Sequence, residues 1–381
     1  MKFFALIALC LLLNACASAP AHGPDTDLFN DAQFAAPSER ISAEDVFALS
    51  EPMNGFLKSS VAPDLRGQGA QRGLFDALFR NGHVSLDYDA ATTRNAAQAF
   101  EAKSGNCLSL VILTAAFARR LELPVRYQYV YLKQAWSRDE GLNVLNEHVN
   151  IVLLSKQRAG APEMIIDFIP AADLAGRRTR VLSESNIIGM YMNNRAVELL
   201  ARGQLDRAYW WARAAITEDP HNLSAFNTLG VIYKTHGNAV EAAGVYRRVL
   251  EVEPDNVVTL GNLVSVLDIL GRKSESTALA ETLAKIQPTP PFYFFDQGTA
   301  AMSRGDFEAA RAMFAREVKR DAYYDKFHFW LGLAYYGLGD LDNARKQLGI
   351  AVDNSTTRTD RDWYLDSLAK IKAGLRPEPR P

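Results

Sequence analysis

The chain has 381 residues, of which 48% are hydrophobic and 23% are charged, and this composition excludes an intrinsically disordered protein. The 42 basic and 44 acidic residues give a formal net charge of −2, so the chain lacks the positive charge that would draw it to nucleic acid. The first predicted element, residues 3–13, is an apolar segment with the length of a signal-peptide core. It is too short to span a bilayer as a helix, and the sequence therefore predicts an exported protein.

The end of this segment, Leu13-Asn14-Ala15-Cys16, resembles the signal of bacterial lipoproteins, in which the cysteine is lipidated and becomes the new N-terminus. The resemblance implies that residues 1–15 are removed as a signal peptide and that Cys16 anchors the chain in a membrane. Ala17 stands where an aspartate keeps some lipoproteins in the inner membrane, which implies an anchor in the outer membrane of the cell envelope, facing the periplasm. An ordinary signal peptide cleaved near Ala15 or Ala17 is the alternative.

Residues 16–38 are rich in Ala, Pro, Asp and Gly and are predicted to form a flexible tether. A first domain is predicted over 39–186. Its helical patterns begin with a capping box at Ser42 and continue at 72–80, 92–103 and 106–121, the last being apolar on nearly all sides. Extended patterns follow at 125–132, 148–154 and 164–169. A central helix followed by strands predicts an antiparallel sheet packed on that helix, and so an α+β domain.

The rest of the chain repeats itself. Pro220, Pro254 and Pro288 fall 34 residues apart, the period of the tetratricopeptide repeat, a helix–turn–helix unit. The five predicted repeats start at Gly189, Leu223, Val257, Pro291 and Asp325. Small residues recur where the two helices of a unit cross, except at Val264 in the third repeat, and the fifteenth position is always glycine: Gly203, Gly237, Gly271, Gly305 and Gly339. The sequence predicts an all-α solenoid over 187–358, followed by a capping helix and tail over 359–381.

Cys107 is the cysteine that remains in the predicted mature chain once Cys10 leaves with the signal peptide and Cys16 carries lipid. It follows a glycine break at Gly105 and stands at the start of the apolar helix, where backbone N–H groups favour a thiolate. His148 and Asp167 lie in the next extended segments, and on adjacent antiparallel strands they can face each other. A buried, inert thiol is the alternative for this cysteine.

Three motifs carry a resemblance to a known family: Gly105-Asn106-Cys107-Leu108-Ser109-Leu110, Glu147-His148-Val149-Asn150 and Ile166-Asp167-Phe168. They are similar to the motifs of the bacterial transglutaminase-like superfamily, in the branch fused to tetratricopeptide repeats, over residues 87–170. The resemblance implies a papain-like fold in which Cys107 is the nucleophile, His148 the general base and acid, and Asp167 the group that orients the histidine. It further implies that Arg94, Asn106 and Trp136 support or line the cleft.

Other chemistry-bearing residues have simpler interpretations. His83 precedes Cys107 and does not fit the family order, His221 and His236 are expected to be solvated in repeat turns, and Glu147 is expected to be a surface carboxylate. Trp210 and Trp211 fit packing between repeats. The sequence contains no cluster with metal-ligand spacing and no glycine-rich phosphate loop, so neither a metal nor another cofactor is expected.

The predicted repeats also suggest a binding groove. The groove-facing positions of the fourth and fifth repeats hold an apolar and aromatic stripe: Phe292, Phe295, Met302, Phe329, Leu333 and Tyr336. In the first two repeats Asn193 and Asn227 can pair with the backbone of an extended peptide. The alternative is that the capping helix from Asp360 folds over the stripe and buries it as core.

These observations predict a lipid-anchored envelope enzyme that transfers an acyl group from a peptide or protein amide through a thioester on Cys107. Transfer to water makes a peptidase or amidase, which we favour because no site for a second amine is evident, and transfer to an amine makes a transamidase. The solenoid would recognise the peptide or an envelope protein partner. The alternative hypotheses are a noncatalytic binding module and an assembly scaffold based on the repeats.

Overall fold

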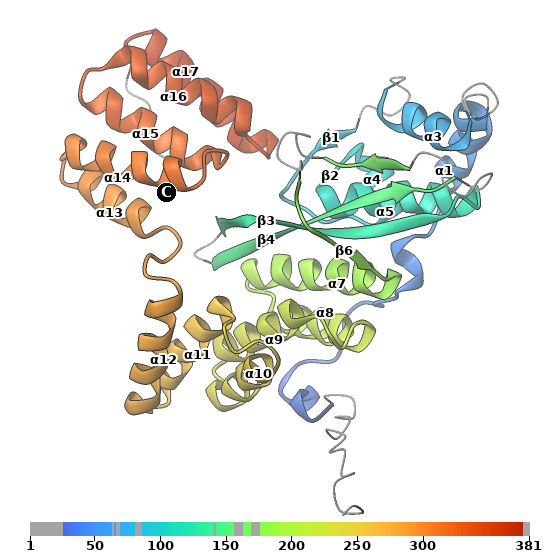
Figure 1. The fold of residues 1–381 in the computed structure, drawn as a ribbon, viewed down its shortest axis with the longest axis horizontal. Coiled ribbons are helices and arrows are strands. Elements are labelled where there is room, and N and C mark those ends of the chain that lie inside the picture. Colours follow the sequence, from blue (N-terminus) through green and yellow to red (C-terminus); the bar gives the residue numbers. More distant parts are fainter. Residues whose placement is uncertain are drawn as a thin grey trace, which may run out of the picture.

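The computed structural model describes residues 26–62, 65, 69–80, 86–139, 142–155, 163–168 and 176–375. The predicted signal peptide, Cys16 and His83 lie outside the described residues. An α+β domain comes first and a long series of helices follows (Figure 1), as the sequence predicted. The helices and strands of the first domain are α1 (Glu51–Phe56), α3 (Ala70–Phe79), β1 (Asp87–Tyr88), α4 (Ala96–Ala102), β2 (Ser104–Gly105), α5 (Cys107–Arg120), β3 (Val125–Asp139), β4 (Leu142–Leu153), β5 (Met164–Ile166) and β6 (Thr179–Leu182).

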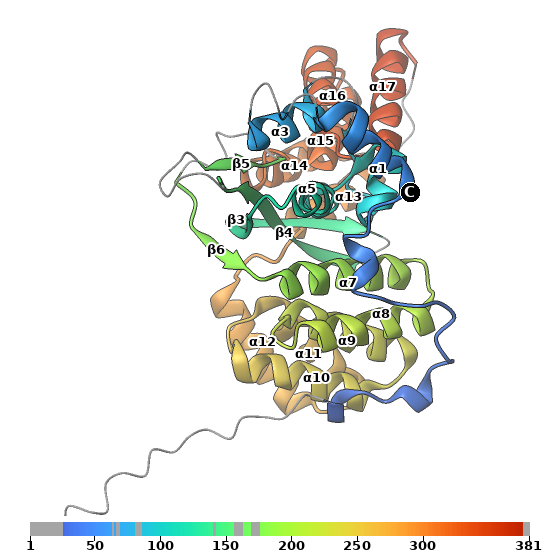
Figure 2. The same ribbon diagram turned by 90° about the vertical axis from the view of Figure 1, so that its right-hand side faces the viewer.

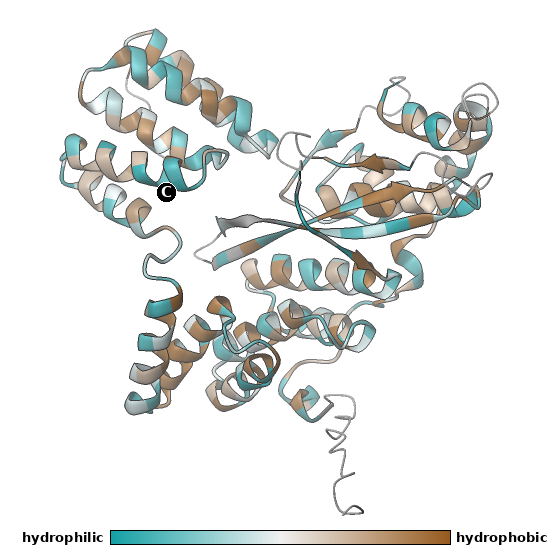
Figure 3. Cartoon of the chain, viewed as in Figure 1, coloured by the Kyte–Doolittle hydropathy of each residue, from teal (hydrophilic) through white to brown (hydrophobic). Residues whose placement is uncertain are grey.

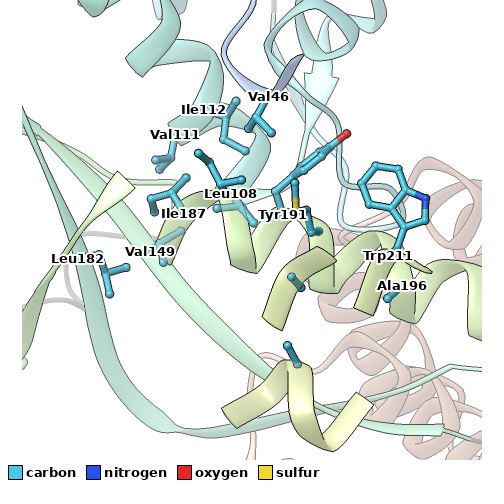
Figure 4. Close-up of a cluster of buried hydrophobic side chains, with 14 of the residues drawn as sticks. Val46, Leu108, Val111, Ile112, Val149, Leu182, Ile187, Tyr191, Ala196 and Trp211 are labelled. Carbon is cyan, nitrogen blue, oxygen red and sulfur yellow. The ribbon is translucent and has the colours of Figure 1, made fainter. Parts of the chain in front are cut away.

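The central helix α5 is buried along most of its length, because its sequence is apolar on almost every side (Figure 3). It packs against a four-stranded antiparallel sheet with the strand order β5-β4-β3-β6, and α7 lies close to both the sheet and α5 (Figure 2). Figure 4 shows α5 residues such as Val111 and Ile112 near Val149 of β4 and Ile187 of α7. These side chains of α5, β4 and α7 share one buried cluster, which joins the first domain to the first helix of the solenoid.

Several elements differ from the sequence-based expectation. The helix predicted to start at Ser42 is only a 3-10 turn, Glu44–Val46. The strands β3 and β4 are longer than predicted and form a hairpin that extends beyond the main sheet, with a register shift between Val130 and Ala135. The short parallel pair β1 and β2 was not predicted, since two-residue strands leave no periodic pattern in a sequence.

The solenoid consists of five helix pairs and a final helix, and its 34-residue periodicity is confirmed. The pairs are α7 (Glu184–Ala201) with α8 (Leu205–Glu218), α9 (Leu223–His236) with α10 (Ala239–Val252), α11 (Val257–Ile269) with α12 (Lys273–Ile286), α13 (Tyr293–Ser303) with α14 (Phe307–Arg320), and α15 (Asp325–Gly337) with α16 (Leu341–Asn354); α17 (Arg358–Lys372) follows. In each pair the turn glycine has a positive φ, from +71° at Gly203 to +98° at Gly237, which L side chains rarely adopt. No described helix is both long and apolar enough to cross a membrane.

The expected tether is not free where the structure describes it. Phe34 is buried and stacks on Tyr209 of α8 with ring centroids 3.9 Å apart. Trp210 Nε1 donates to the Ala35 carbonyl at 2.7 Å, and Trp211 Nε1 donates to Glu39 at 2.9 Å. The two tryptophans of the first repeat therefore hold the N-terminal segment rather than packing only between repeats. His236 is also part of this contact, since its ring lies 4.7 Å from that of Phe34.

The far end of the solenoid returns to the first domain. The Ala90 backbone N–H donates to the Thr356 carbonyl at 3.0 Å, and Arg358 lies 3.5 Å from the Asp87 carboxylate. On the hairpin, Arg138 pairs with Asp296 of α13. The solenoid thus contacts the α+β domain at its start through α7 and again through its fourth and fifth repeats, and it curves around the space between them (Figure 1).

Candidate active site

Cys107 is the first residue of α5, and Asn106 is the N-cap of that helix. The Asn106 side-chain oxygen accepts hydrogen bonds from the backbone N–H of Ser109 at 2.9 Å and from its hydroxyl at 2.8 Å. The Asn106 amide in turn donates to Thr93 Oγ1 at 2.8 Å. The cap fixes the first turn of α5, so the half-buried thiol stays where unpaired backbone N–H groups and the helix dipole favour negative charge.

Position 105 has to be glycine because the backbone there lies very close to Ser109 in the first turn of α5. A Cβ at this position would lie 2.6 Å from Cβ of Ser109, a distance that no relaxed structure tolerates. Any side chain would push the helix start away from β2. The Gly105-Asn106-Cys107 motif is therefore explained locally: the glycine permits the approach, the asparagine caps the helix, and the cysteine occupies its first position.

His148 and Asp167 meet, as the sequence predicted. The Nε2 atom of His148 lies 2.7 Å from Oδ1 of Asp167, and both side chains are only 6% exposed. Asp167 was expected inside a strand, but it directly follows β5, which ends at Ile166. Leaving the strand lets the carboxylate turn toward β4, whereas His148 lies within β4 itself.

The neighbours of His148 favour its charged form. Burial by itself lowers the pKa of the imidazole, but the hydrogen bonds to Asp167 and to the Cys107 thiol, together with the negative charge of both partners, raise it to about 9. Since Nε2 is bonded to Asp167, Nδ1 remains for the thiol. An imidazole of this basicity can take the thiol proton, which produces a thiolate–imidazolium pair.

Sequence reasoning did not assign a role to Asn150, although it lies in the quoted motif. Its Nδ2 atom donates to Oδ2 of Asp167 at 2.8 Å, so the carboxylate is held between this amide and the imidazole. Asn150 is 3% exposed. The period of two in a strand places it on the same face as His148, and this is the signal that could have identified it.

Glu147 does not join this group. Its carboxylate accepts a hydrogen bond from Ser224 of α9 at 3.3 Å, on the side of the sheet that faces the solenoid. Burial raises the pKa of this carboxyl group, while Ser224 and Arg180 oppose the rise. The interpretation as a surface carboxylate was therefore wrong, and Glu147 lies at the contact between the α+β domain and the second repeat.

Of the three residues predicted to support or line the cleft, two lie near Cys107 and one does not. Arg94 donates to Asp89 at 2.9 Å, and its backbone N–H donates to Ser109 Oγ at 2.8 Å, so it ties the segment before α4 to the first turn of α5. Trp136 pairs with Leu145 in the outer part of the hairpin, about 10 Å along β4 from His148. The structure thus brings Arg94 and Asn106 to the site and leaves Trp136 on the hairpin.

The aromatic stripe of the fourth and fifth repeats is mostly core, which corrects the prediction of an open groove. Phe329 is fully buried by Trp363 and Tyr364 of α17, at centroid distances of 4.0 and 5.0 Å. Phe292 is 2% exposed, with the Arg138 guanidinium 4.4 Å from its ring centroid. The capping helix covers the apolar positions because they would otherwise leave a large hydrophobic surface in water.

The remaining groove candidates are less buried or are already hydrogen-bonded. Phe295 and Tyr336 are half-buried, and Phe295 packs against Phe314 and Trp330. Asn193 is only 7% exposed. Asn227 accepts a hydrogen bond from the Asn262 amide at 3.0 Å. Asn193 is therefore mostly covered, whereas Phe295, Tyr336 and Asn227 keep part of their surface exposed.

Within the part of the chain that the structure describes, no group of three or more His, Cys, Asp or Glu residues is placed to hold a metal ion. The arrangement consists of a thiol at a helix start, a basic imidazole and a carboxylate fixed by an amide. This is the donor set of thiol-based acyl transfer, in which the carboxylate orients and stabilises the imidazolium.

Comparisons with known proteins agree with this domain organisation. The family model described as the transglutaminase-like superfamily matches residues 59–158, and a tetratricopeptide-repeat model matches residues 295–356. The chain therefore contains a transglutaminase-like domain followed by tetratricopeptide repeats. It is 29% identical over 156 residues to the TPR repeat-containing protein YvcD of Bacillus subtilis (strain 168), a match that covers 40% of this chain and 31% of that protein.

Solved structures with likeness to this chain are tetratricopeptide-repeat proteins. The thermophilic protein TTC0263 from Thermus thermophilus is 16% identical, with a TM-score of 0.30, over 49% of this chain and 99% of its own. YrrB, described as having an unusual peptide-binding site, is 18% identical with a TM-score of 0.26 over 47% and 91% of the two chains. MamA is 18% identical with a TM-score of 0.24 over 42% and 93%.

Proposed function

We propose that this protein is an exported, lipid-anchored cysteine enzyme that cleaves an amide of a peptide or protein by acyl transfer through Cys107. The observation that carries the proposal is the arrangement of the three groups: the Cys107 thiol interacts with His148, and Nε2 of His148 lies 2.7 Å from Oδ1 of Asp167. A buried, inert thiol would need neither a basic imidazole beside it nor a carboxylate behind that imidazole.

The reaction follows from these positions. The Cys107 thiolate attacks the amide carbonyl carbon, a C–S bond forms, and the carbonyl π electrons move to oxygen. The tetrahedral intermediate then expels the amine, which takes its proton from His148, and a thioester remains on Cys107. His148, now neutral, removes a proton from water, which attacks the thioester and releases the acid. Asp167 and Asn150 keep the imidazole oriented throughout.

The solenoid would recognise the protein that carries the amide, or an envelope partner. Tetratricopeptide repeats support this role in general terms because stacked helix pairs form extended binding surfaces. A scaffold without catalysis is the second candidate function, and the repeats favour it because they make up about half of the chain. In that case Cys107 would have no role beyond packing.

One measurement distinguishes the two candidates. Protein expressed from residue 26, without the signal segment, is treated with iodoacetamide near neutral pH, and the rate at Cys107 is compared with that of free cysteine. The enzyme proposal expects a faster reaction that His148→Ala removes. A rate no faster than free cysteine, unaffected by His148→Ala, would leave the scaffold as the function.

The lipid anchor is proposed from Leu13-Asn14-Ala15-Cys16. Metabolic labelling with a palmitate analogue should mark the full-length chain, and membrane fractionation should place it with outer membranes. Cys16→Ser should abolish the label and prevent normal processing. Cys107→Ser is the matched control, since it removes a thiol elsewhere in the chain. Equal labelling of the wild type and Cys16→Ser would reject the anchor.

A further inference from the structure

Tyr88 is held beside the active site by the short parallel strands that the sequence did not reveal. In this pair Asp87 lies opposite Ser104 and Tyr88 lies opposite Gly105. The Asp87 N–H donates to the Lys103 carbonyl at 2.9 Å, and the Asp89 N–H donates to the Gly105 carbonyl at 3.1 Å. Tyr88 is thus fixed from both sides against the segment that leads directly into Cys107.

The side chain of Tyr88 reaches the first residue of α5. Its hydroxyl lies near the backbone N–H and the side chain of Cys107. Gly105, its partner across the ladder, has no side chain to stand in the way. The residue as a whole remains 41% exposed, so the ring also borders the solvent from which a substrate must arrive.

The hydroxyl is a neutral donor. Burial raises the pKa of Tyr88, and the negative charges of Cys107, Asp89 and Asp167 raise it further, although the Cys107 N–H opposes the rise. The phenol therefore keeps its proton near neutral pH. A protonated phenol beside a thiolate can give a hydrogen bond to negative charge that appears on a neighbouring atom.

We propose that the Tyr88 hydroxyl is the side-chain donor that stabilises the oxyanion formed on attack by Cys107, an inference that rests on the proposed acyl-transfer function. The backbone N–H of Cys107 is the second donor. When the C–S bond forms, the carbonyl π electrons move to oxygen, and this oxygen accepts a hydrogen bond from the Cys107 N–H. The phenol then turns its O–H toward the oxyanion, and the electrons return to carbon as the amine leaves.

The position of the donor is tied to the solenoid. The residues around Tyr88 contact the segment that leads into α17, through Ala90 to Thr356 in the loop after α16 and through Asp87 to Arg358 at the start of α17. Asp89 is fixed in addition by Arg94 at 2.9 Å. These contacts hold the backbone that carries the donor, so only the hydroxyl has to turn when the oxyanion forms, and a donor held in place in this way contributes more to catalysis.

The test compares two reactions of the same thiol. Acylation of Cys107 by 4-nitrophenyl acetate passes through a tetrahedral oxyanion, whereas alkylation by iodoacetamide does not. We expect Tyr88→Phe to slow acylation roughly 100-fold while alkylation changes by no more than about threefold. Tyr131→Phe is the matched control, because Tyr131 is a 37% exposed tyrosine on β3 and should leave both rates unchanged.

The outcomes separate this inference from the function on which it rests. A wild-type protein that is neither alkylated quickly nor acylated at Cys107 would overturn both. Wild-type acylation that depends on His148, with an equal rate in Tyr88→Phe, would overturn the role of Tyr88 alone. Faster acylation in Tyr88→Phe would also overturn it, since the hydroxyl would then be an obstruction at the oxyanion position. Equal melting temperatures of Tyr88→Phe and Tyr131→Phe would exclude misfolding as the cause of a slower acylation in Tyr88→Phe.

Discussion

The imidazole of His148 lies between two groups that favour its protonated form, the Cys107 thiol and the Asp167 carboxylate. Its side chain is almost fully buried, so neither interaction is strongly screened by water. Asn150 completes the arrangement by holding the second carboxylate oxygen. At the scale of the residue, the surroundings of His148 favour a protonated imidazole paired with the Asp167 carboxylate.

This arrangement predicts a pH dependence of stability. The folded pKa of His148, about 9, is raised above its ordinary value of 6.5, so the stabilisation is fully present below about pH 6.5 and is lost as the pH rises toward 9. The free energy of unfolding of the wild type should therefore exceed that of His148→Gln by more at pH 6 than at pH 9.5. Urea denaturation at the two pH values measures this difference. A difference that stays constant would contradict the raised pKa.

At the scale of the element, the first turn of α5 carries the chemistry. Asn106 caps the helix and Gly105 permits its close approach to Ser109, so the thiol position depends on local backbone geometry as well as on the sheet. The helix α4 begins with a similar asparagine cap at Asn95, which lies on a more exposed surface. The two caps offer a comparison in which the same side chain is removed from a functional and a structural helix.

Asn106→Ala and Asn95→Ala should each lower the free energy of unfolding by about 1 kcal/mol, because each leaves backbone N–H groups without a partner. Only Asn106→Ala should slow iodoacetamide alkylation of Cys107, by roughly fivefold, since the first turn of α5 would lose its fixed orientation toward the thiolate. Denaturation curves and alkylation rates of both variants provide the check. If the alkylation rate fell equally in Asn106→Ala and Asn95→Ala, the effect would come from lower overall stability and not from the first turn of α5.

The helix α17 acts as the end cap of the solenoid. It buries Phe329 beneath Trp363 and Tyr364, and it leaves the more exposed Tyr323 uncovered. Phe329→Ala should therefore cost about 3–5 kcal/mol of stability, as expected for removal of a buried aromatic ring. Tyr323→Ala, at a position that is 64% exposed, should change stability by no more than about 0.5 kcal/mol. Weaker protein binding by Phe329→Ala at an unchanged melting temperature would contradict the packing role.

At the scale of the whole molecule, the solenoid and the transglutaminase-like domain contact each other at two distant places. The first is formed by α7 and the second repeat, and the second is formed by Arg138, Ala90 and Asp87 with the fourth and fifth repeats. The second contact consists of a few polar and ionic interactions, so it is the weaker one. It nevertheless adjoins the strand that carries Tyr88.

Arg138→Ala should loosen the second contact, because it removes the ion pair with Asp296 and the cation–π contact with Phe292. Its cost in global stability should be small, about 1 kcal/mol or less, since the pair is partly exposed. Small-angle X-ray scattering should show a larger radius of gyration, and amide exchange should increase at 87–90. Arg345→Ala, which removes a surface ion pair with Asp342, is the matched control. An unchanged radius of gyration in both variants would show that the Arg138 contact does not hold the solenoid against the first domain.

The sequence alone was sufficient for features that depend on neighbouring residues. A glycine with positive φ in each repeat turn, small residues where paired helices cross, and a cysteine at the start of an apolar helix all leave local or periodic patterns. The pairing of His148 with Asp167 was also predictable, from the alternation of side chains in strands and from the resemblance to a family. In each case the physical requirement involves one residue and a partner at a fixed spacing.

Tertiary structure alone decided which surfaces meet. The N-terminal segment lies on α8 and α9, α17 covers Phe329, the last repeats return to the strand that carries Tyr88, and Trp136 lies away from the site. These contacts join residues that can be more than 170 positions apart, as in Ala35 and Trp210. An aromatic or amide side chain in the sequence shows that the folded chain has to provide it with a partner, but it does not show which partner. The choice depends on the shape and polarity of surfaces that exist only after the chain has folded.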